Sequence, residues 1–306
     1  MKTSRFYYAD AVQHVYQRAK DHGVIFYSLE DRIVYYTLAA VKSKKFGVTV
    51  LAAAVMYTHL HQSLKTSRLA SLRKYLNSLN STFARLYNKH YRRENSFFDW
   101  NPGRAQKSSP KSKRSNIIYV FNNHEEKHLC NKAIEERWSL LAYAKSDHPF
   151  SKVINFKHAS EPFLKAIRLV DKRLENATYL SYKDLSKVFP YLNNIEIEQF
   201  TDYVISRYQL IDYAAAAELF GGIGNMIASI GNTTGSEFDL KEDFNSLTDQ
   251  AYVELVEYAD KEGLAYKIYR LEPDEKTEWA SRAKIATSAT LHHLCKFFHI
   301  SYLGYA

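Results

Sequence analysis

The sequence predicts an α+β fold, in which a mostly antiparallel sheet carries helices on one face and a mainly helical segment follows. Two observations lead to this prediction. In residues 1–148, short apolar or alternating segments typical of strands are separated by longer segments with helical spacing. From Glu161 onward, only the helical spacing recurs.

The first predicted strand covers residues 12–19, where apolar and polar residues alternate weakly. A helix over residues 29–45 follows, because Ser28 is a suitable N-cap and Gly47 is a common C-terminal signal. Residues 48–55 are apolar enough for a central strand. Residues 59–64 either continue that strand or form a neighbouring one after a turn at Tyr57-Thr58.

A long amphipathic helix is predicted over residues 67–91, with one apolar and one basic face. Residues 96–100 suit a fourth strand, and the Lys- and Ser-rich residues 104–114 suit a flexible loop. Ser115 then caps a helix over residues 116–127. The resulting order, β-α-β-β-α-β-α, predicts a ferredoxin-like arrangement with the helices on one face of the sheet.

The distribution of charge supports a division into two domains, residues 1–148 and 149–306. Residues 1–150 contain 25 Lys and Arg against 11 Asp and Glu, a net charge of +14, whereas the remaining residues have a net charge of −5. Composition and periodicity also change near Asp147-His148-Pro149. The basic part is therefore the expected binding site for a polyanion, and the helical part is expected to be an accessory domain.

Residues 62–114 are the most basic segment, with 13 Lys and Arg and only two acids, Glu94 and Asp99. Cations mixed with aromatic side chains suit phosphate attraction combined with base stacking. The alternative is a basic helix face that is simply solvated. The aromatic residues concerned are Tyr75, Phe83, Tyr87, Tyr91, Phe97, Phe98 and Trp100.

The two cysteines, Cys130 and Cys295, are far apart and form no CxxC motif, so neither a disulfide framework nor a zinc module is expected. The first residues are too polar for a signal sequence, and no apolar run is long enough to cross a bilayer. A soluble, cytoplasmic protein without membrane contact is therefore expected.

His59 and His61 are separated by one residue on a predicted strand, so both project from the same face, roughly 6.5 to 7 Å apart. A single divalent ion can bridge such a pair. Tyr119 and Asn123 are four residues apart on a predicted helix and share a face as well. The alternative is that the His-x-His pair is a solvated or hydrogen-bonded pair without a metal role.

Residues 12–143 resemble the single-tyrosine HUH transposases of the REP-associated and insertion-sequence-200-like branch, which are bacterial. The similarity departs from the family pattern at Tyr57-Thr58, Gln62-Ser63 and His124. It rests on five blocks in the family's order: His14-Val15-Tyr16-Gln17-Arg18, Gly47-Val48 to Met56, Met56-Tyr57-Thr58-His59-Leu60-His61, Tyr119-Val120-Phe121-Asn122-Asn123 and Trp138-Ser139-Leu140-Leu141-Ala142-Tyr143.

The resemblance implies that His59, His61 and Asn123 bind Mg²⁺ or Mn²⁺ and that Tyr119 is the nucleophile. A phenol with a pKa of about 10 is a poor nucleophile at neutral pH, and a divalent ion compensates by stabilising charge on the phosphate. The implied reaction is the nicking and transfer of single-stranded DNA through a 5′-phosphotyrosine, as in DNA transposition. The implied partner is single-stranded or hairpin DNA, bound by a monomer or homodimer.

Five cations just before the tyrosine helix are expected to contact the DNA backbone: Arg104, Lys107, Lys111, Lys113 and Arg114. Two other functions stay open. One is a non-catalytic, ferredoxin-like protein that binds single-stranded nucleic acid and whose histidines are structural. The other is a replication-initiator or relaxase-like nickase, although these usually have a longer catalytic domain or an attached helicase.

Overall fold

The computed structural model describes residues 7–20, 23–94, 97–98, 102–232 and 249–301. Four strands form one sheet in the order β2-β3-β1-β4, and every neighbouring pair is antiparallel. The fold is thus α+β with an antiparallel sheet, as predicted. The strands are β1 (Val12–Arg18), β2 (Thr49–Val55), β3 (His59–Lys65) and β4 (Gly103–Lys107).

Helix α1 (Leu29–Phe46) has the ends that the sequence predicts. The Ser28 side chain accepts a hydrogen bond from the Asp31 backbone, and the Asp31 side chain accepts one from the Ser28 backbone, which forms a capping box. Gly47 ends the helix at φ 61°, a conformation that glycine adopts without a steric penalty. Helix α2 (Leu69–Tyr91) begins two residues later than predicted and ends where predicted.

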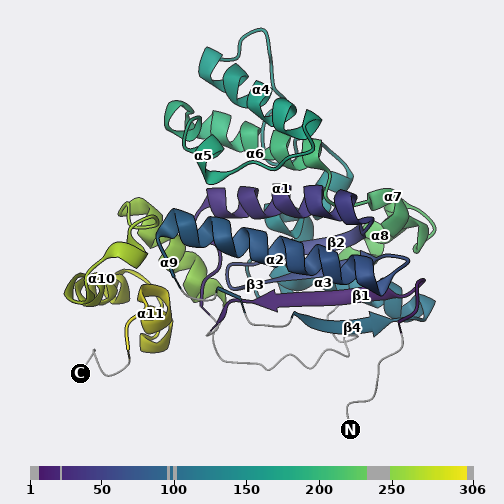
Figure 1. Cartoon of the computed structure of the whole chain (residues 1–306), viewed down its shortest axis with the longest axis horizontal. Coiled ribbons are helices and arrows are strands. Elements are labelled where there is room, and N and C mark those ends of the chain that lie inside the picture. The colour runs from purple at the N-terminus through teal and green to yellow at the C-terminus, as the bar shows by residue number, and fades with distance from the viewer. Residues whose placement is uncertain (1–6, 21–22, 95–96, 99–101, 233–248, 302–306) are drawn as a thin grey trace.

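Helices cover both faces of the sheet, so the prediction that they lie on one face is wrong. The side chain of Gln62 on β3 bonds to Tyr35 of α1 and Tyr75 of α2. The next residue, Ser63, points the other way and donates to Asn116 of α3 (Pro110–Glu126). Figure 1 accordingly shows α1 and α2 in front of the sheet and α3 behind it.

The prediction of a loop over residues 104–114 is also wrong. Gly103–Lys107 pairs with β1 as the edge strand, and α3 begins at Pro110, where Ser109 rather than Ser115 is the N-cap. A serine followed by proline at the first helical position is a helix start, which the Lys- and Ser-rich composition concealed. Of the predicted strand 96–100, Phe98 forms an isolated bridge with Ala19, while residues 96, 99 and 100 lie outside the described residues.

The described residues after 148 form helices joined by turns and irregular segments, in agreement with the predicted mainly helical half. The α-helices are α4 (Glu161–Glu175), α5 (Tyr182–Leu185), α6 (Asn194–Tyr208), α7 (Tyr213–Glu218), α8 (Ile223–Gly231), α9 (Asp249–Lys261), α10 (Pro273–Ala286) and α11 (Leu291–Phe298). Short 3-10 helices are η2 (Ala133–Glu135), η3 (Arg137–Ser139), η4 (Leu141–Ala144), η5 (Phe189–Tyr191) and η6 (Ile268–Arg270). None of the described helices combines the length and apolar character that crossing a membrane requires.

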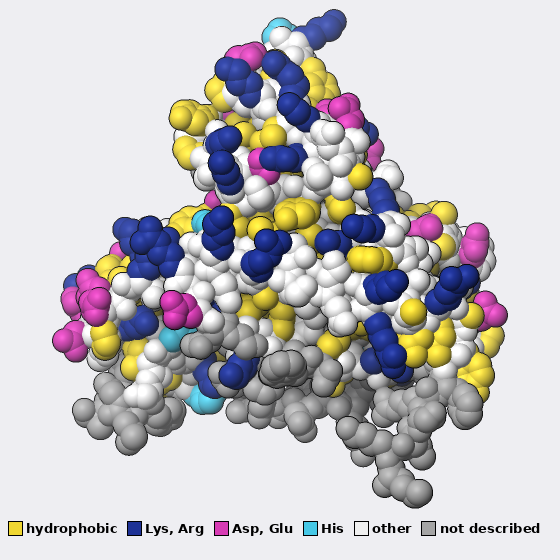
Figure 2. All heavy atoms as spheres, in the orientation of Figure 1, with side chains coloured by type: hydrophobic (Ala, Val, Ile, Leu, Met, Phe, Trp, Pro, Cys, Tyr) yellow, Lys and Arg dark blue, Asp and Glu magenta, His cyan; other side chains and the backbone are white. Residues whose placement is uncertain are grey.

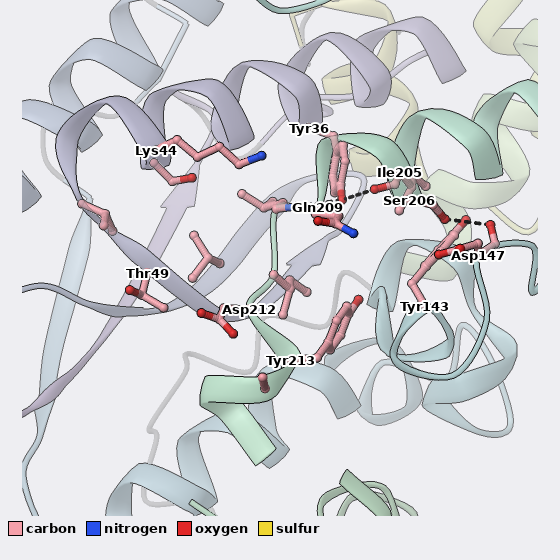
Figure 3. A pocket seen from close by; sticks show the side chains of 16 residues that line it. Tyr36, Lys44, Thr49, Tyr143, Asp147, Ile205, Ser206, Gln209, Asp212 and Tyr213 are labelled. Carbon is pink, nitrogen blue, oxygen red and sulfur yellow. Dashed lines mark hydrogen bonds between the residues drawn. The ribbon is translucent and has the colours of Figure 1, made fainter. Parts of the chain in front are cut away.

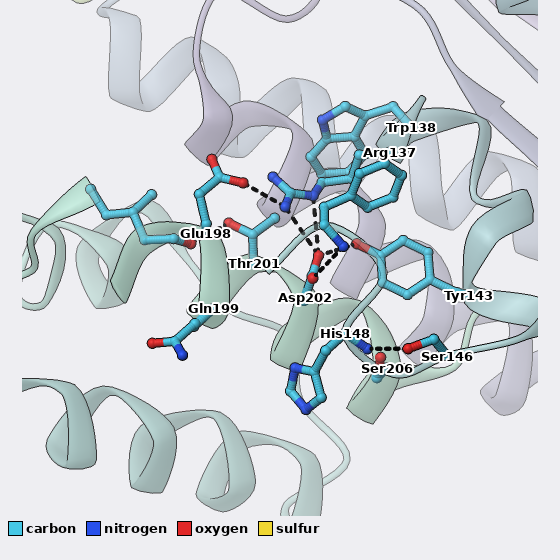
Figure 4. Close-up of polar contacts among 12 residues, drawn as sticks. Arg137, Trp138, Tyr143, Ser146, His148, Glu198, Gln199, Thr201, Asp202 and Ser206 are labelled. Carbon is cyan, nitrogen blue, oxygen red and sulfur yellow. Dashed lines mark hydrogen bonds and ion pairs between the residues drawn. The ribbon is translucent and has the colours of Figure 1, made fainter. Parts of the chain in front are cut away.

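A buried carboxylate fastens α6 to the segment that follows α3. Asp202 is fully buried and accepts hydrogen bonds from the Arg137 guanidinium, the Tyr143 hydroxyl and the Phe150 backbone (Figure 4). Arg137 also contacts Glu198 at 2.5 Å. These charge-assisted bonds join residues on both sides of the predicted boundary at 148. The division into two domains stays a prediction.

Six of the seven aromatic side chains named in the basic segment belong to the core, and the seventh, Trp100, lies outside the described residues. Tyr75, Phe83, Tyr87 and Tyr91 are at most 1% exposed, and Phe97 and Phe98 are also buried. They lie under α2 against Phe26 and Tyr35, with ring centroids between 4 and 6 Å apart. They are therefore not available for stacking on nucleic-acid bases, contrary to the interpretation of this segment from sequence.

Candidate functional site

Helix α3 runs antiparallel to β3, so that successive helical turns meet alternate residues of the strand. Asn116 accepts a hydrogen bond of 2.7 Å from Ser63. One turn later, the Tyr119 ring lies 5.5 Å from the His61 ring. At the next turn, the His124 imidazole interacts electrostatically with His59. The polar side chains of the strand therefore face the polar side of the helix.

His59 and His61 lie side by side, with ring centroids 4.9 Å apart and ring planes nearly perpendicular. Each Nδ1 atom is engaged by a neighbour. The Thr58 hydroxyl lies 2.9 Å from His59 Nδ1, and His14 Nε2 lies 3.0 Å from His61 Nδ1. While these contacts hold, Nε2 is the nitrogen through which each imidazole would bind an ion.

Tyr119 lies edge-on against two imidazoles. Its ring centroid is 5.5 Å from those of both His14 and His61, while the two imidazoles stack on each other at 5.2 Å. Register explains the cluster, because His14 and Tyr16 of β1 project from the same face as His61 of the neighbouring β3. His14 was not among the site residues predicted from the sequence. The available signal was the alternation of side chains along β1, but the register between β1 and β3 was not known from the sequence.

Asn123 lies one helical turn beyond Tyr119 and is fully buried. Within the described part of the chain, neither the oxygen nor the nitrogen of its side-chain amide has a hydrogen-bond partner. Leaving such groups unpaired in a protein interior costs about 1–3 kcal/mol each. A buried amide in this state has the chemistry of a ligand that lacks its ion or its hydrogen-bonding substrate.

Burial strongly affects the histidines of this face. It lowers the pKa of His61 well below its ordinary value, and the neighbouring His59 and His14 lower it further. Burial also lowers the pKa of His124 to about 4. Both rings are therefore neutral at pH 7, and a neutral imidazole is the form that can bind a metal.

The donor set is compatible with a divalent ion of intermediate softness. Two imidazole nitrogens and one amide oxygen suit Mn²⁺ better than Mg²⁺, which prefers oxygen ligands. Among the described residues, no group of three or more His, Cys, Asp or Glu side chains is arranged to hold a metal. A metal site here would combine His59 and His61 with the amide of Asn123.

The whole cluster is enclosed. Tyr119 is 4% exposed, His59 is 2% exposed, and His61 and Asn123 are fully buried. A cavity of about 520 Å³ opens elsewhere, where the end of α1 and the start of β2 meet α6 and α7 (Figure 3). Two of the hydroxyls that line it are already engaged: Tyr36 donates to Ile205 O at 2.9 Å and Ser206 to Asp147 O at 2.7 Å.

The five predicted DNA-contacting residues do not form one patch. By alternation along β4, Arg104 lies opposite Val15, on the sheet face of α1 and α2, whereas Lys107 lies opposite Val12, on the face of α3. Lys111, Lys113 and Arg114 occupy the first turns of α3. The edge strand thus carries one cation on each of its faces.

Neither family models nor curated proteins match this sequence. One solved structure with some similarity is a REP-associated tyrosine transposase bound to a REP hairpin. The superposition covers 45% of this chain and 81% of that chain, with a TM-score of 0.36 and 8% sequence identity. These values are too low to support an argument about function. The inference of function depends instead on the arrangement of His59, His61, Tyr119 and Asn123.

Proposed function

We propose that this protein nicks single-stranded DNA and transfers the cut strand through a 5′-phosphotyrosine at Tyr119, as in DNA transposition. The observation that supports this most directly is the position of Tyr119, whose ring is 5.5 Å from His61 and one helical turn from the unpartnered amide of Asn123. A potential nucleophile and three potential metal ligands thus occupy one interface between β3 and α3.

His59, His61 and Asn123 would hold a divalent ion, with Mn²⁺ or Mg²⁺ as the candidates. When bound, such an ion would orient the scissile phosphate and stabilise the charge that develops on it. Thr58 and His14 are positioning residues in this proposal. In this proposal, His14 Nε2 would accept the Nδ1 proton of His61 across their 3.0 Å contact, which would select the His61 tautomer with its lone pair on Nε2.

In the proposed reaction, the Tyr119 hydroxyl oxygen attacks the phosphorus of a DNA phosphodiester and gives up its proton to solvent. The bond from phosphorus to O3′ breaks, and O3′ takes up a proton to leave as a 3′-OH. The 5′ phosphate remains esterified to Tyr119. Attack by a 3′-OH on the phosphorus of this ester reverses these reaction steps, restores the phenol and joins the strands without ATP.

The enclosed site sets a condition on this reaction. Because Tyr119 is only 4% exposed, a phosphodiester reaches it only after the groups packed over it move.

The topology of the sheet is a further part of the proposal. We assign the sheet to the ferredoxin-like class, because its β-α-β-β-α-β succession and its β2-β3-β1-β4 order are those of that arrangement.

Detection of a covalent adduct tests the proposal. Full-length protein is incubated with labelled single-stranded DNA containing a hairpin, in Mn²⁺ or in EDTA, and resolved on a denaturing gel. We expect a metal-dependent adduct that Tyr119→Phe abolishes. Tyr16→Phe is the matched control, since Tyr16 also lies near His61, with ring centroids 6.3 Å apart. An adduct that persists in Tyr119→Phe would refute the assignment.

A second candidate function is non-catalytic binding of single-stranded nucleic acid. The burial of the cluster and the direct contact between His14 and His61 favour it, because both are typical of structural histidines. It predicts binding that a chelator leaves unchanged and no covalent product on any hairpin substrate. The same gel assay, combined with a binding measurement in EDTA, separates the two functions.

A further inference from the structure

The sequence contains no acidic residue between Arg32 and Arg93, although it contains 12 Lys and Arg over that range. This stretch includes most of α1 and all of α2. Lys and Arg side chains accordingly lie over these two helices on the face shown in Figure 2. This is the sheet face opposite to α3 and the candidate site.

Four of these cations form a row along the solvent side of α2. Lys74, Arg85 and Lys89 are exposed, and their spacing of 11 and 4 residues keeps them within about 60° of one another around the helix axis, while the exposed C-cap residue Arg92 continues the row at the end of the helix. The row spans about 27 Å at 1.5 Å per residue. Asn77 and Ser81 lie between them and supply neutral donors.

The C-terminal end of α1 adds Lys42 and Lys45 beside this row. Partial burial lowers the pKa of Lys42, and the positive charges of Lys45 and Arg85 lower it further, so cations of the two helices are close enough to repel. We call Lys42, Lys45, Lys74, Arg85, Lys89 and Arg92 the cationic face. None of the six forms an ion pair with a described residue.

The cationic face offers charge and hydrogen-bond donors, whereas the aromatic ring beside Lys45, that of Phe46, is partly buried. The aromatic residues of α2 are buried, and the large exposed hydrophobic residues lie outside α1 and α2 in the described chain. Stacking on unpaired bases needs exposed rings, and insertion into a lipid surface needs exposed apolar side chains. The phosphates of a base-paired helix need neither, because they are reached by cations and amides alone.

We propose that the cationic face binds the sugar–phosphate backbone of a base-paired DNA stem, independently of its sequence. The choice of DNA rests on the proposed function, and the inference adds which part of the DNA is bound and where. The 27 Å row approaches the length of one duplex turn, about 34 Å. Arg104 and Lys107, on opposite faces of the edge strand, would guide the adjoining single strand from the stem toward Tyr119.

Fluorescence anisotropy in EDTA tests the inference, using full-length Tyr119→Phe protein so that no covalent product forms. The probes are a labelled hairpin, a linear duplex with the stem sequence, and an oligo-dT strand of equal length. The test variant carries Lys74→Ser, Arg85→Ser and Lys89→Ser. The matched control carries Lys165→Ser, Lys172→Ser and Lys183→Ser, which remove three exposed charges from α4 and α5.

We expect the test variant to lose at least ten-fold in affinity for hairpin and duplex, and much less for oligo-dT. The slope of log affinity against log salt should become shallower by about 2.7, since each lost phosphate contact contributes about 0.9. The control variant should keep wild-type values. Urea unfolding midpoints equal to that of the parent would establish that all variants are folded.

Three results would overturn the inference: unchanged hairpin affinity and salt slope in the test variant, an equal loss in the control variant, or a loss confined to oligo-dT. Binding of phosphatidylserine vesicles in preference to duplex would overturn it as well. Because no step needs Tyr119, the outcome is separate from the adduct assay. A protein that shows the expected pattern but forms no adduct keeps this inference and loses the proposed nucleophile.

Discussion

The two faces of β3 differ in what they bury. On the side of α1 and α2, Leu60 and Leu64 pack into an apolar core, and Gln62 has partners on both helices. On the side of α3, His59, His61 and Ser63 meet a helix surface of asparagine, tyrosine and histidine. Both faces are equally hidden from solvent, yet only the first contributes mainly hydrophobic stabilisation.

The difference agrees with the proposed role of the α3 face in chemistry rather than in stability. Burying imidazole and amide groups is unfavourable unless each finds a partner, and a core of apolar residues would serve stability better. Asn123 shows this most clearly, because its amide is buried without a hydrogen-bond partner among the described residues. We therefore expect substitutions on the two faces to have different consequences.

Phe83→Ala should have the largest effect on stability. Phe83 is fully buried, and its ring lies 5.2 Å from Tyr35 and 5.8 Å from Phe97. Its truncation should lower the free energy of unfolding by about 3–5 kcal/mol in urea titration. Tyr119→Phe, on the opposite face, should change it by less than about 1 kcal/mol. Equal effects would remove the distinction between the faces.

His14→Phe should weaken Mn²⁺ binding by about 10- to 100-fold, the usual cost of removing a hydrogen-bond partner of a metal ligand. His14→Gln keeps an acceptor and should recover part of the affinity, measured by electron paramagnetic resonance titration. Imidazole nitrogen NMR gives a readout that is independent of metal. The wild type should show His61 protonated on Nδ1, and protonation on Nε2 would contradict the role of His14.

Asn123→Leu should raise the free energy of unfolding by about 1 kcal/mol while abolishing Mn²⁺ binding. The leucine side chain has the same number of non-hydrogen atoms and the same branch point, and it removes two unsatisfied polar atoms from the interior. Asn122→Leu is the contrasting control, because the Asn122 amide donates to Ile230 O at 2.9 Å and its loss should destabilise. A destabilised Asn123→Leu protein would mean that this amide has a structural partner.

The smallest expected effect concerns His90, on the side of α1 and α2. Burial and, to a lesser extent, Arg270 lower its pKa to about 4, and its ring stacks on Tyr182 at 4.1 Å. The unfolded chain, with a histidine pKa near 6.5, binds this proton more readily, so stability falls as pH drops from about 6.5 toward 4.

His90→Phe keeps the stacking but cannot titrate. Its unfolding midpoint in urea should therefore fall less than that of the wild type between pH 7 and pH 5. Burial raises the pKa of nearby Asp31 to about 7, which acts in the opposite direction, but Asp31 is present in both proteins and its contribution largely cancels. An identical pH response in the two proteins would assign the effect to other groups.

Local signals predicted the elements of the first half well where caps and periodicity agreed. Ser28 and Gly47 mark the ends of α1, and the apolar spacing of α2 is that of its buried face. The prediction failed over residues 104–114, because five cations and several serines resemble a loop. Pairing of Gly103–Lys107 with β1 is a long-range interaction, and no local pattern encodes it.

The side-by-side position of His59 and His61 follows directly from strand alternation, and Tyr119 and Asn123 share a face because of helical spacing. His14 was not predicted as a site residue, for a different reason. Its contact with His61 depends on the register between β1 and β3, which places it opposite Ser63. Burial of the aromatic residues could not be predicted either, since the sequence pattern of a basic amphipathic helix is the same whether its aromatic rings are packed or exposed.

Mapping the DNA attachment site by mass spectrometry is the sharpest test of whether Tyr119 is the nucleophile. Protein treated with hairpin DNA in Mn²⁺ is digested with nuclease and protease, and peptides covering α3 are sequenced for a phosphorylated tyrosine. We expect a nucleotide or phosphate on Tyr119 in Mn²⁺ and none in EDTA. Attachment to another residue, or a complete absence of modified peptide while Mn²⁺ binds at His59 and His61, would contradict it.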